Sequence, residues 1–343
     1  MTEQQWNDLI AVLRGEQPRQ LPIGFIIDCP WLPNWFGVTI LDYLASDEVW
    51  FAANRKAIET FPECMFLPGF WSEFGMCTEP SAFGCRCQFP ANEFPYAERV
   101  IQTEADVDKI IVPDPATDGL LPFMLNRLVR HRARIEALGH HIRFSVSRGP
   151  LNIATFLMGT TEFLMMLATD PERTHKLLRC INTFLVQWHA RQRQAIDSID
   201  GILVLDDIVG FISEDDFKEF ALPYLKELFE AQATVKLFHN DANCAQSVKY
   251  YPDIGINLYN PGVQMTVADL HRATGNRLAI LGNIPPRDVL ANGTPDDVRA
   301  AVRNLLAETP DHTRFMPSCG GGMPPGVTTA NIRAFIEGVA RGA

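Results

Sequence analysis

The chain has 343 residues, of which 47% are hydrophobic and 21% are charged, and its formal net charge is −11. This composition supports a large buried core and excludes an intrinsically disordered protein. The acidic excess argues against nucleic acid or an anionic membrane surface as the main partner. The first residues lack the pattern of a signal peptide, and the apolar runs are shorter than the roughly 20 residues of a membrane span. We therefore expect a cytoplasmic protein of enzyme size with reduced cysteines.

The first part of the chain predicts an extension that precedes a repeating pattern. Residues 4–14 show the pattern of an amphipathic helix, and residues 21–28 form an apolar run that stops at the carboxylate of Asp28. Residues 47–60 read as a second helix. Residues 63–96 are dense in Phe, Trp, Gly and Pro, which predicts an irregular or hairpin-rich, aromatic insertion over an entrance.

From residue 121 onward, short apolar strands alternate with helices. The expected strands are residues 142–147, 201–205, 235–238, 254–258, 278–281 and 314–317. The expected helices are residues 121–138, 151–167, 171–198, 213–231, 242–250, 267–274, 295–308 and 331–340. Such alternation predicts βα units and a parallel sheet. The number of consecutive units favours a closed (β/α)₈ barrel, with residues 1–343 as a single domain.

Polar side chains follow nearly every predicted strand. They are Asp28, Arg148, Asp206, Asp207, His239, Asp241, Asn260, Asn283 and Cys319. In a parallel barrel, the chemistry lies where strands end and the following loops begin. Because loops are polar in any case, the collective pattern carries more weight than any single position.

A candidate metal site comes from three of these side chains. His239 and Asp241 are two residues apart, so on an extended backbone they point to the same side. Cys319 follows the last predicted strand, and all strand ends of a closed barrel converge on one rim. A histidine, a carboxylate and a thiolate with an open position suit catalytic zinc. Alternatively, His239 and Asp241 form a hydrogen-bonded pair that holds a loop, and Cys319 is a buried thiol.

Other candidate residues have two interpretations each. Asp206 or Asp207 can act as a general base, a metal ligand or an anchor for a cationic group, or can cap the following helix. Arg148 can clamp a carboxylate or phosphate, or can pair with an acid on a neighbouring strand. Cys85 and Cys87 can bind metal or form a redox pair, or can be ordinary thiols.

Several segments, taken in order, resemble the uroporphyrinogen decarboxylase superfamily, and the resemblance covers about residues 75–340. The matching pieces are TEPSAFG at 78–84, Gly149-Pro150, Met158-Gly159, Asp206-Asp207, Ser213-Glu214, ALPY at 221–224, His239-Asn240-Asp241, LGNI at 281–284, NGTP at 292–295, Gly320-Gly321-Gly322 and Asn331. The resemblance implies a (β/α)₈ barrel.

Two differences separate the chain from the true decarboxylase. The decarboxylase starts with an arginine-rich segment that binds substrate carboxylates, whereas residues 25–30 (FIIDCP) contain no arginine. It also carries a histidine near the C-terminal glycine segment, where this chain has Cys319. The chain looks closer to the branch of methylcobalamin:coenzyme M methyltransferases. The zinc motif of that branch is His-x-Cys followed by a distant Cys; His239 and Cys319 match two ligands, and Asp241 replaces the first cysteine.

The resemblance to this branch implies zinc, a methyl group carried by cobalamin on a separate corrinoid protein, and a small-molecule donor or acceptor. Transfer to a thiol and O-demethylation of an ether or alcohol both fit the residues. Glu79, Asp206 and Asp207 are expected to supply a further ligand or a proton relay. Arg148, Asn283 and Asp28 are expected to contact the substrate. The alternatives are a metal-free decarboxylase of a carboxylated substrate, and a tetrapyrrole-binding module without catalysis.

Overall fold

The computed structural model describes residues 1–27 and 30–342 of the chain. Its largest sheet has six parallel strands, which lie side by side in chain order. These strands are β5 (Phe144–Arg148), β6 (Gly201–Leu205), β7 (Val235–Asn240), β8 (Leu258–Pro261), β9 (Ala279–Ile284) and β10 (Phe315–Cys319). Two more parallel strands, β1 (Ile23–Ile26) and β2 (Cys64–Leu67), form a pair. A bridge between Ile26 and Gly322 joins β1 to the end of β10.

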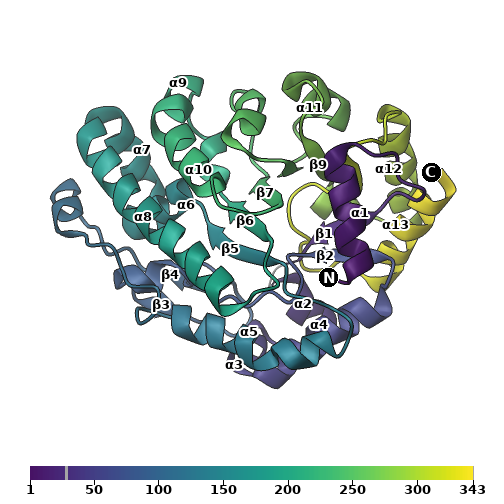
Figure 1. Cartoon of the computed structure of the whole chain (residues 1–343), viewed down its shortest axis with the longest axis horizontal. Coiled ribbons are helices and arrows are strands. Elements are labelled where there is room, and N and C mark those ends of the chain that lie inside the picture. The colour runs from purple at the N-terminus through teal and green to yellow at the C-terminus, as the bar shows by residue number, and fades with distance from the viewer. Residues whose placement is uncertain (28–29, 343) are drawn as a thin grey trace.

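The eight parallel strands occupy the middle of the molecule, and helices surround them (Figure 1). The longer helices are α4 (Asp47–Thr60), α5 (Leu121–Glu136), α6 (Pro150–Met158), α7 (Thr160–Thr169), α8 (Pro171–Ala195), α10 (Leu222–Phe229), α11 (Val267–Thr274), α12 (Pro295–Glu308) and α13 (Thr329–Gly342). The shorter helices are α2 (Trp31–Phe36), α3 (Ile40–Ala45) and α9 (Glu214–Asp216). The expected (β/α)₈ barrel is therefore confirmed.

Alternating residues of each strand face two different apolar clusters. On β6, Leu203 packs in the cluster inside the barrel, whereas Ile202 and Val204 pack in the cluster between the strands and the outer helices. This two-residue period follows from the pleat of an extended strand. Both layers are fully buried, which explains why these strands read as continuous apolar runs in the sequence.

Helix α1 (Glu3–Arg14) closes the amino-terminal end of the barrel. Its buried residues Trp6, Leu9 and Val12 join the cluster inside the barrel, and the ring of Trp6 meets Phe144, at the start of β5, edge-on at 5.6 Å. Thr2 and Gln5 form a capping box at its start, which satisfies backbone N–H groups that the helix leaves unpaired. The predicted N-terminal helix thus acts as a plug at the end opposite to the strand carboxyl ends.

Several predicted elements differ from the structure. In place of the helix expected at 242–250, the structure has turns followed by the 3₁₀ segment η5 (Val248–Ile254). The segment at 63–96, expected to be irregular or hairpin-rich, also contains the parallel strand β2, and the hairpin is present as β3 (Cys87–Gln88) and β4 (Tyr96–Ala97). The single helix expected at 151–167 is broken at Gly159, whose φ of +102° leaves the helical region. The strand expected at 254–258 begins at its last residue, because Gly255 at φ +94° ends a short 3₁₀ segment there.

Among the described residues, no single helix is both long and apolar enough to cross a membrane. The consecutive helices α6 and α7 reach that length and composition only when taken together, and they are bent by 110° with respect to each other.

Candidate active site

A cavity of about 560 Å³ opens at the carboxyl end of the barrel strands. The ionisable side chains on its wall are Arg148, Asp207, His239, Asp241 and Arg287, and its aromatic side chains are Trp71, Phe94 and Phe156. A larger cavity of about 750 Å³ lies beside α1 at the amino end and contains none of the predicted site residues. The site therefore belongs to the carboxyl end, as parallel-barrel enzymes require.

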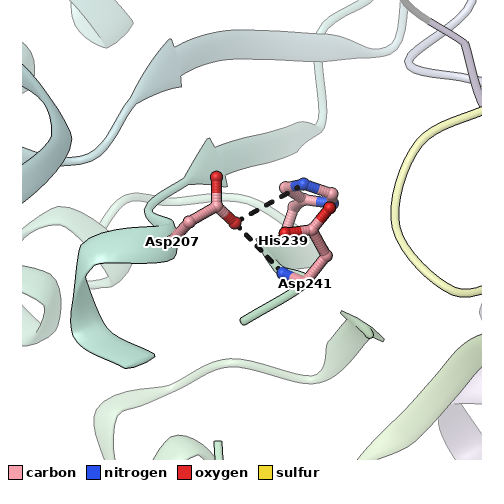
Figure 2. Close-up of side chains that lie close together, drawn as sticks. All are labelled: Asp207, His239 and Asp241. Carbon is pink, nitrogen blue, oxygen red and sulfur yellow. Dashed lines mark hydrogen bonds and ion pairs between the residues drawn. The ribbon is translucent and has the colours of Figure 1, made fainter. Parts of the chain in front are cut away.

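Asp207, His239 and Asp241 form the central cluster of this cavity (Figure 2). Each offers one ligand atom, and these atoms all lie within 4.8 Å of one another. The Nε2 atom of His239 lies 3.7 Å from Oδ1 of Asp207, and the same oxygen accepts a 3.0 Å hydrogen bond from the backbone N–H of Asp241. His239 is buried, Asp207 is half-buried and Asp241 is exposed. The cluster is thus fixed on one side and open on the other.

Asn260 on β8 sets the tautomer of His239. Its Nδ2 atom donates to the carbonyl oxygens of Leu281, at 2.7 Å, and Cys319, at 3.5 Å, which can only accept. Its Oδ1 atom must therefore face His239 Nδ1, 2.7 Å away, and Nδ1 must carry the proton. The neutral ring then presents the lone pair of Nε2 to the cavity, which is the state needed for a metal ligand or a general base.

Close backbone packing holds Asp241 in place. A Cβ atom on Gly321, which has φ of +72°, would lie 2.8 Å from Oδ2 of Asp241, and one on Gly262 would lie 2.1 Å from its carbonyl oxygen. Only glycine lets both loops approach this closely. Although Asp241 is exposed as a whole residue, the packing of the neighbouring loops around its carboxylate raises its pKa, and repulsion from Asp207 raises the pKa further. A divalent cation between the two carboxylates would relieve that repulsion.

The donor set fits a divalent metal ion. Two ligands that each lie about 2 Å from a common ion are separated by roughly 3–4 Å, and the His239–Asp207 distance of 3.7 Å falls in this range. One imidazole nitrogen and two carboxylates are acceptable to zinc and to other borderline metals. Cys319, the third predicted ligand, is not part of this cluster. It is fully buried at the end of β10, and its Sγ atom lies 3.7 Å from the carbonyl oxygen of Gly321.

Asp206 has a structural contact instead of a place on the cavity wall. Its two carboxylate oxygens accept the backbone N–H groups of Leu151, at 2.8 Å, and Asn152, at 3.1 Å, in the first turn of α6. The capping interpretation therefore describes its contacts, but the helix that it caps precedes it in the chain. A Cβ atom on Gly149 would lie 2.3 Å from the carboxylate. Complete burial raises the pKa of Asp206 to about 8.

Arg148 and Glu79 form a buried charge cluster under the cavity together with Glu73. Nη2 of Arg148 lies 2.9 Å from Glu73, Nη1 lies 4.0 Å from Glu79, and the backbone N–H of Arg148 donates to Glu79 at 3.1 Å. Burial raises the pKa of Glu79. The guanidinium also lies 5.9 Å from the ring of Trp71. The guanidinium of Arg148, predicted to bind a carboxylate or phosphate of a ligand, is thus paired with carboxylates of the chain itself.

The remaining predicted residues are placed as follows. Nδ2 of Asn283 donates to the carbonyl oxygens of Gly262 and Met265, so this residue holds the loop that packs on Asp241. It does not line the cavity in the part of the chain that the structure describes. Asp28 lies outside the described residues.

Sequence reasoning missed the roles of three residues. Asn260 was among the strand-end residues, but only the sheet register, which pairs it with His239, reveals that it orients the imidazole. Arg287 carries no motif; it is the second residue of a turn of π-helix, η6 (Pro286–Ala291), and its positive charge partly offsets the rise in the pKa of Asp241. Glu73 lies within the aromatic insertion, where no regular spacing marks it.

Comparison with known proteins places this site in a family. Curated uroporphyrinogen decarboxylases from Chlorobium phaeobacteroides and Photobacterium profundum are both 27% identical, over 250 and 277 residues. The first match covers 69% of each chain, and the second covers 76% of this chain and 75% of the relative. A methyltransferase from Methanosarcina mazei has a TM-score of 0.82 at 17% identity and covers 98% of both chains.

A B12-independent methionine synthase from Shewanella sp. W3-18-1 is a more distant structural match, with a TM-score of 0.52 and 12% identity over 94% of this chain and 96% of that one. At these identities, both solved structures show a common fold alone. The family model described as uroporphyrinogen decarboxylase (URO-D) matches residues 7–342. This match takes in the barrel and every described residue of the site, and the chain therefore belongs to the URO-D family.

Proposed function

We propose that the chain is a zinc-assisted, corrinoid-dependent methyltransferase, which moves a methyl group between a small molecule and a cobalamin carried by a partner protein. The observation that supports this most is the Asp207–His239–Asp241 cluster, with Nε2 of His239 directed into the cavity by Asn260. The structural likeness to a methanogen methyltransferase is in line with methyl transfer within the superfamily.

Each residue of the cluster has a role in this proposal. His239 and Asp241 hold the metal together with Asp207, and Cys319, at the end of β10, is proposed as a further ligand. A bound zinc ion would act as a Lewis acid, which lowers the pKa of a coordinated thiol or polarises an ether oxygen. The apolar wall with Trp71, Phe94 and Phe156 excludes water from the methyl group and receives the apolar part of the ligand.

The carboxylates favour one direction of transfer. Two carboxylates donate less electron density to zinc than two thiolates do, so the metal keeps more Lewis acidity. This suits activation of the oxygen in a methyl ether or alcohol, with reduced cobalamin as the methyl acceptor. Arg287, at the rim beside Asp241, is placed to receive an anionic group of such a donor.

The test is an assay for methylation of reduced cobalamin by methyl ethers, and for demethylation of methylcobalamin by thiols, with and without added zinc. Ether-dependent methylation that requires zinc and is lost in His239→Gln supports the proposal. A second variant, Asp241→Cys, restores the His-x-Cys pattern and should raise the rate of thiol-dependent methyl transfer. Zinc-independent turnover would contradict the proposal.

A decarboxylase is the second candidate, because the curated relatives at 27% identity carry that name. The placement of Arg148 speaks against it, since its guanidinium is held by Glu73 and Glu79 instead of facing a substrate carboxylate alone. Release of CO₂ from a carboxylated substrate in the presence of a metal chelator would favour the decarboxylase.

A further inference from the structure

Three cysteines lie together beside the cavity, and two of them are in contact. Sγ of Cys87, on β3, lies 3.9 Å from the carbonyl oxygen of Cys77 and 3.7 Å from that of Cys85. The thiols of Cys77 and Cys87 also share a side-chain hydrogen bond. Cys77 is fully buried and Cys87 is half-buried. Cys87 therefore lies against both Cys85 of the same motif and Cys77, ten residues away in the chain, and its thiol–thiol hydrogen bond is with Cys77.

The contact ties the β3–β4 hairpin to the wall of the cavity. Met76 precedes Cys77 and lines the cavity, and Phe94 lies between β3 and β4 and also lines it. The backbone N–H of Met76 donates to the carbonyl oxygen of Pro95 at 3.0 Å. A Cβ atom on Gly75 would lie 2.8 Å from Cδ of Pro95. The hairpin and the segment around Cys77 thus pack closely enough for a covalent link to need little movement.

The environments of the two thiols differ, and Cys87 is the more accessible and more reactive of the two. The hydrogen bond from Cys77 lowers the pKa of Cys87, and the same hydrogen bond, followed by burial, raises the pKa of Cys77. A half-buried thiol of lowered pKa reacts first with an oxidant, because the thiolate is the nucleophile. A buried neighbour of raised pKa is protected from the oxidant, and its contact with Cys87 places it to react with the oxidised partner.

We propose that Cys87 is a peroxide-reactive cysteine and that Cys77 is its resolving partner, so that oxidation fixes the β3–β4 hairpin to the cavity wall. The Cys87 thiolate attacks one oxygen of hydrogen peroxide, the O–O bond breaks, and hydroxide leaves a sulfenic acid on Cys87. The sulfur of Cys77 then attacks Cys87, the S–O bond breaks, and the Cys77 proton leaves with the oxygen as water. Two electrons pass from the two thiols to peroxide.

The link changes the cavity through its wall. It joins the segment next to Met76 to the hairpin that carries Phe94, and it restricts how far these two side chains separate. Large ligands that need the hairpin to move are excluded from the oxidised protein, whereas the metal cluster on β6 and β7 is not touched.

The test is to treat the full-length protein with a small excess of hydrogen peroxide and to digest it with trypsin without reduction. Trypsin cleaves after Lys56, Arg86 and Arg99, so Cys87 falls on peptide 87–99 and Cys77 on peptide 57–86. The expected product is the two peptides linked, two hydrogens lighter than their sum. Because peptide 57–86 also contains Cys64 and Cys85, single variants assign the partner.

Cys85→Ser is expected to keep the link, and Cys77→Ser is expected to lose it and to leave a sulfenic acid on Cys87 that a dimedone probe captures. Should Cys77→Ser fail to fold, the half-buried Cys87→Ser variant must lose the same link. Chymotrypsin should cut the hairpin after the exposed Tyr96, which is followed by Ala97, several-fold more slowly in the oxidised wild type and at an unchanged rate in peroxide-treated Cys87→Ser. A link that survives in Cys77→Ser, or peroxide-treated wild type with no link, overturns the proposal.

Discussion

At the scale of single residues, the orientation of His239 is the most informative feature of the site. A histidine beside two carboxylates can serve as a loop-holding pair or as a ligand, and both interpretations were open in the sequence. The bond from Nδ1 to Asn260 decides which nitrogen faces the cavity, because the amide of Asn260 is itself fixed by backbone carbonyls. The contact that orients His239 is therefore made by a residue outside the metal cluster itself.

Replacement of Asn260 tests this arrangement. Asn260→Leu removes the acceptor for Nδ1–H of His239, so the imidazole loses its fixed tautomer and orientation. We expect the affinity for zinc to fall about 10- to 100-fold, measured by competition with a chromogenic chelator. The matched control is Asn331→Leu, which also removes an amide bonded to two carbonyl oxygens, those of Leu290 and Gly293, but has no bond to His239. Equal loss of zinc affinity in both variants would contradict the assignment.

A second histidine gives the stability a predictable pH dependence. His189 on α8 is completely buried between the hydroxyls of Ser145 and Ser147, and burial lowers its pKa to about 3. At pH values below the ordinary histidine pKa of 6.5, His189 is protonated in the unfolded chain but stays neutral in the folded chain. Stability is therefore complete above pH 6.5 and is lost as the pH falls toward 3, by at most about 1.4 kcal/mol per pH unit for this group.

Urea unfolding at pH 7.5 and pH 5.0 measures this effect. The free energy of unfolding of the wild type should fall between these two values by more than that of His189→Gln, in which the titrating group is absent. If the two proteins lose the same amount, His189 is not the source of the pH dependence.

At the scale of elements, the two ends of the barrel have separate tasks. Helix α1 fills the amino-terminal end with Trp6, Leu9 and Val12, and the loops at the carboxyl end carry the cavity. At the carboxyl end, the first turn of α6 has a structural contact that supports the cavity. Its N–H groups bind the carboxylate of Asp206, which fixes the loop that presents the neighbouring Asp207 to the cluster. A structural cap thus positions a candidate ligand.

The plug predicts a variant that affects stability without affecting the site. Trp6→Ala leaves a large void against Phe144, and we expect unfolding in urea to become easier by about 3–5 kcal/mol. The number of zinc ions bound per chain should stay unchanged in the folded variant, because the cluster lies at the other end of the strands. The exposed residue Gln4 on the same helix supplies the control, since Gln4→Ala should change stability little. A loss of zinc in folded Trp6→Ala would show that the ends are coupled.

At the scale of the whole molecule, periodicity predicted the parallel sheet and favoured a closed barrel, because the strands are buried on both faces and read as apolar runs; the family resemblance also implied the barrel. The same reasoning passed over β2, since four apolar residues inside an aromatic insertion give no distinct period. It brought His239 and Asp241 together, as residues on one face of a strand end. It could not select Asp207 in preference to Asp206, because which of two adjacent carboxylates faces the cavity depends on the backbone turn after β6.

The direction of the Cys319 side chain could not be predicted from the sequence either. Its place at the end of β10 was predictable, but the direction of its side chain depends on the glycine loop that follows, which brings its sulfur to the carbonyl of Gly321. Its predicted role as a zinc ligand stays a prediction that a variant can test against the carboxylates.

The most direct test of the account is the zinc content of the purified chain after dialysis against a weak chelator, compared with that of Asp207→Asn, His239→Gln and Cys319→Ser. We predict close to one zinc ion per wild-type chain, none in the first two variants, and a reduced but measurable amount in Cys319→Ser. A folded wild type that binds no zinc, or full zinc content in both Asp207→Asn and His239→Gln, would contradict the metal centre and with it the proposed methyl transfer.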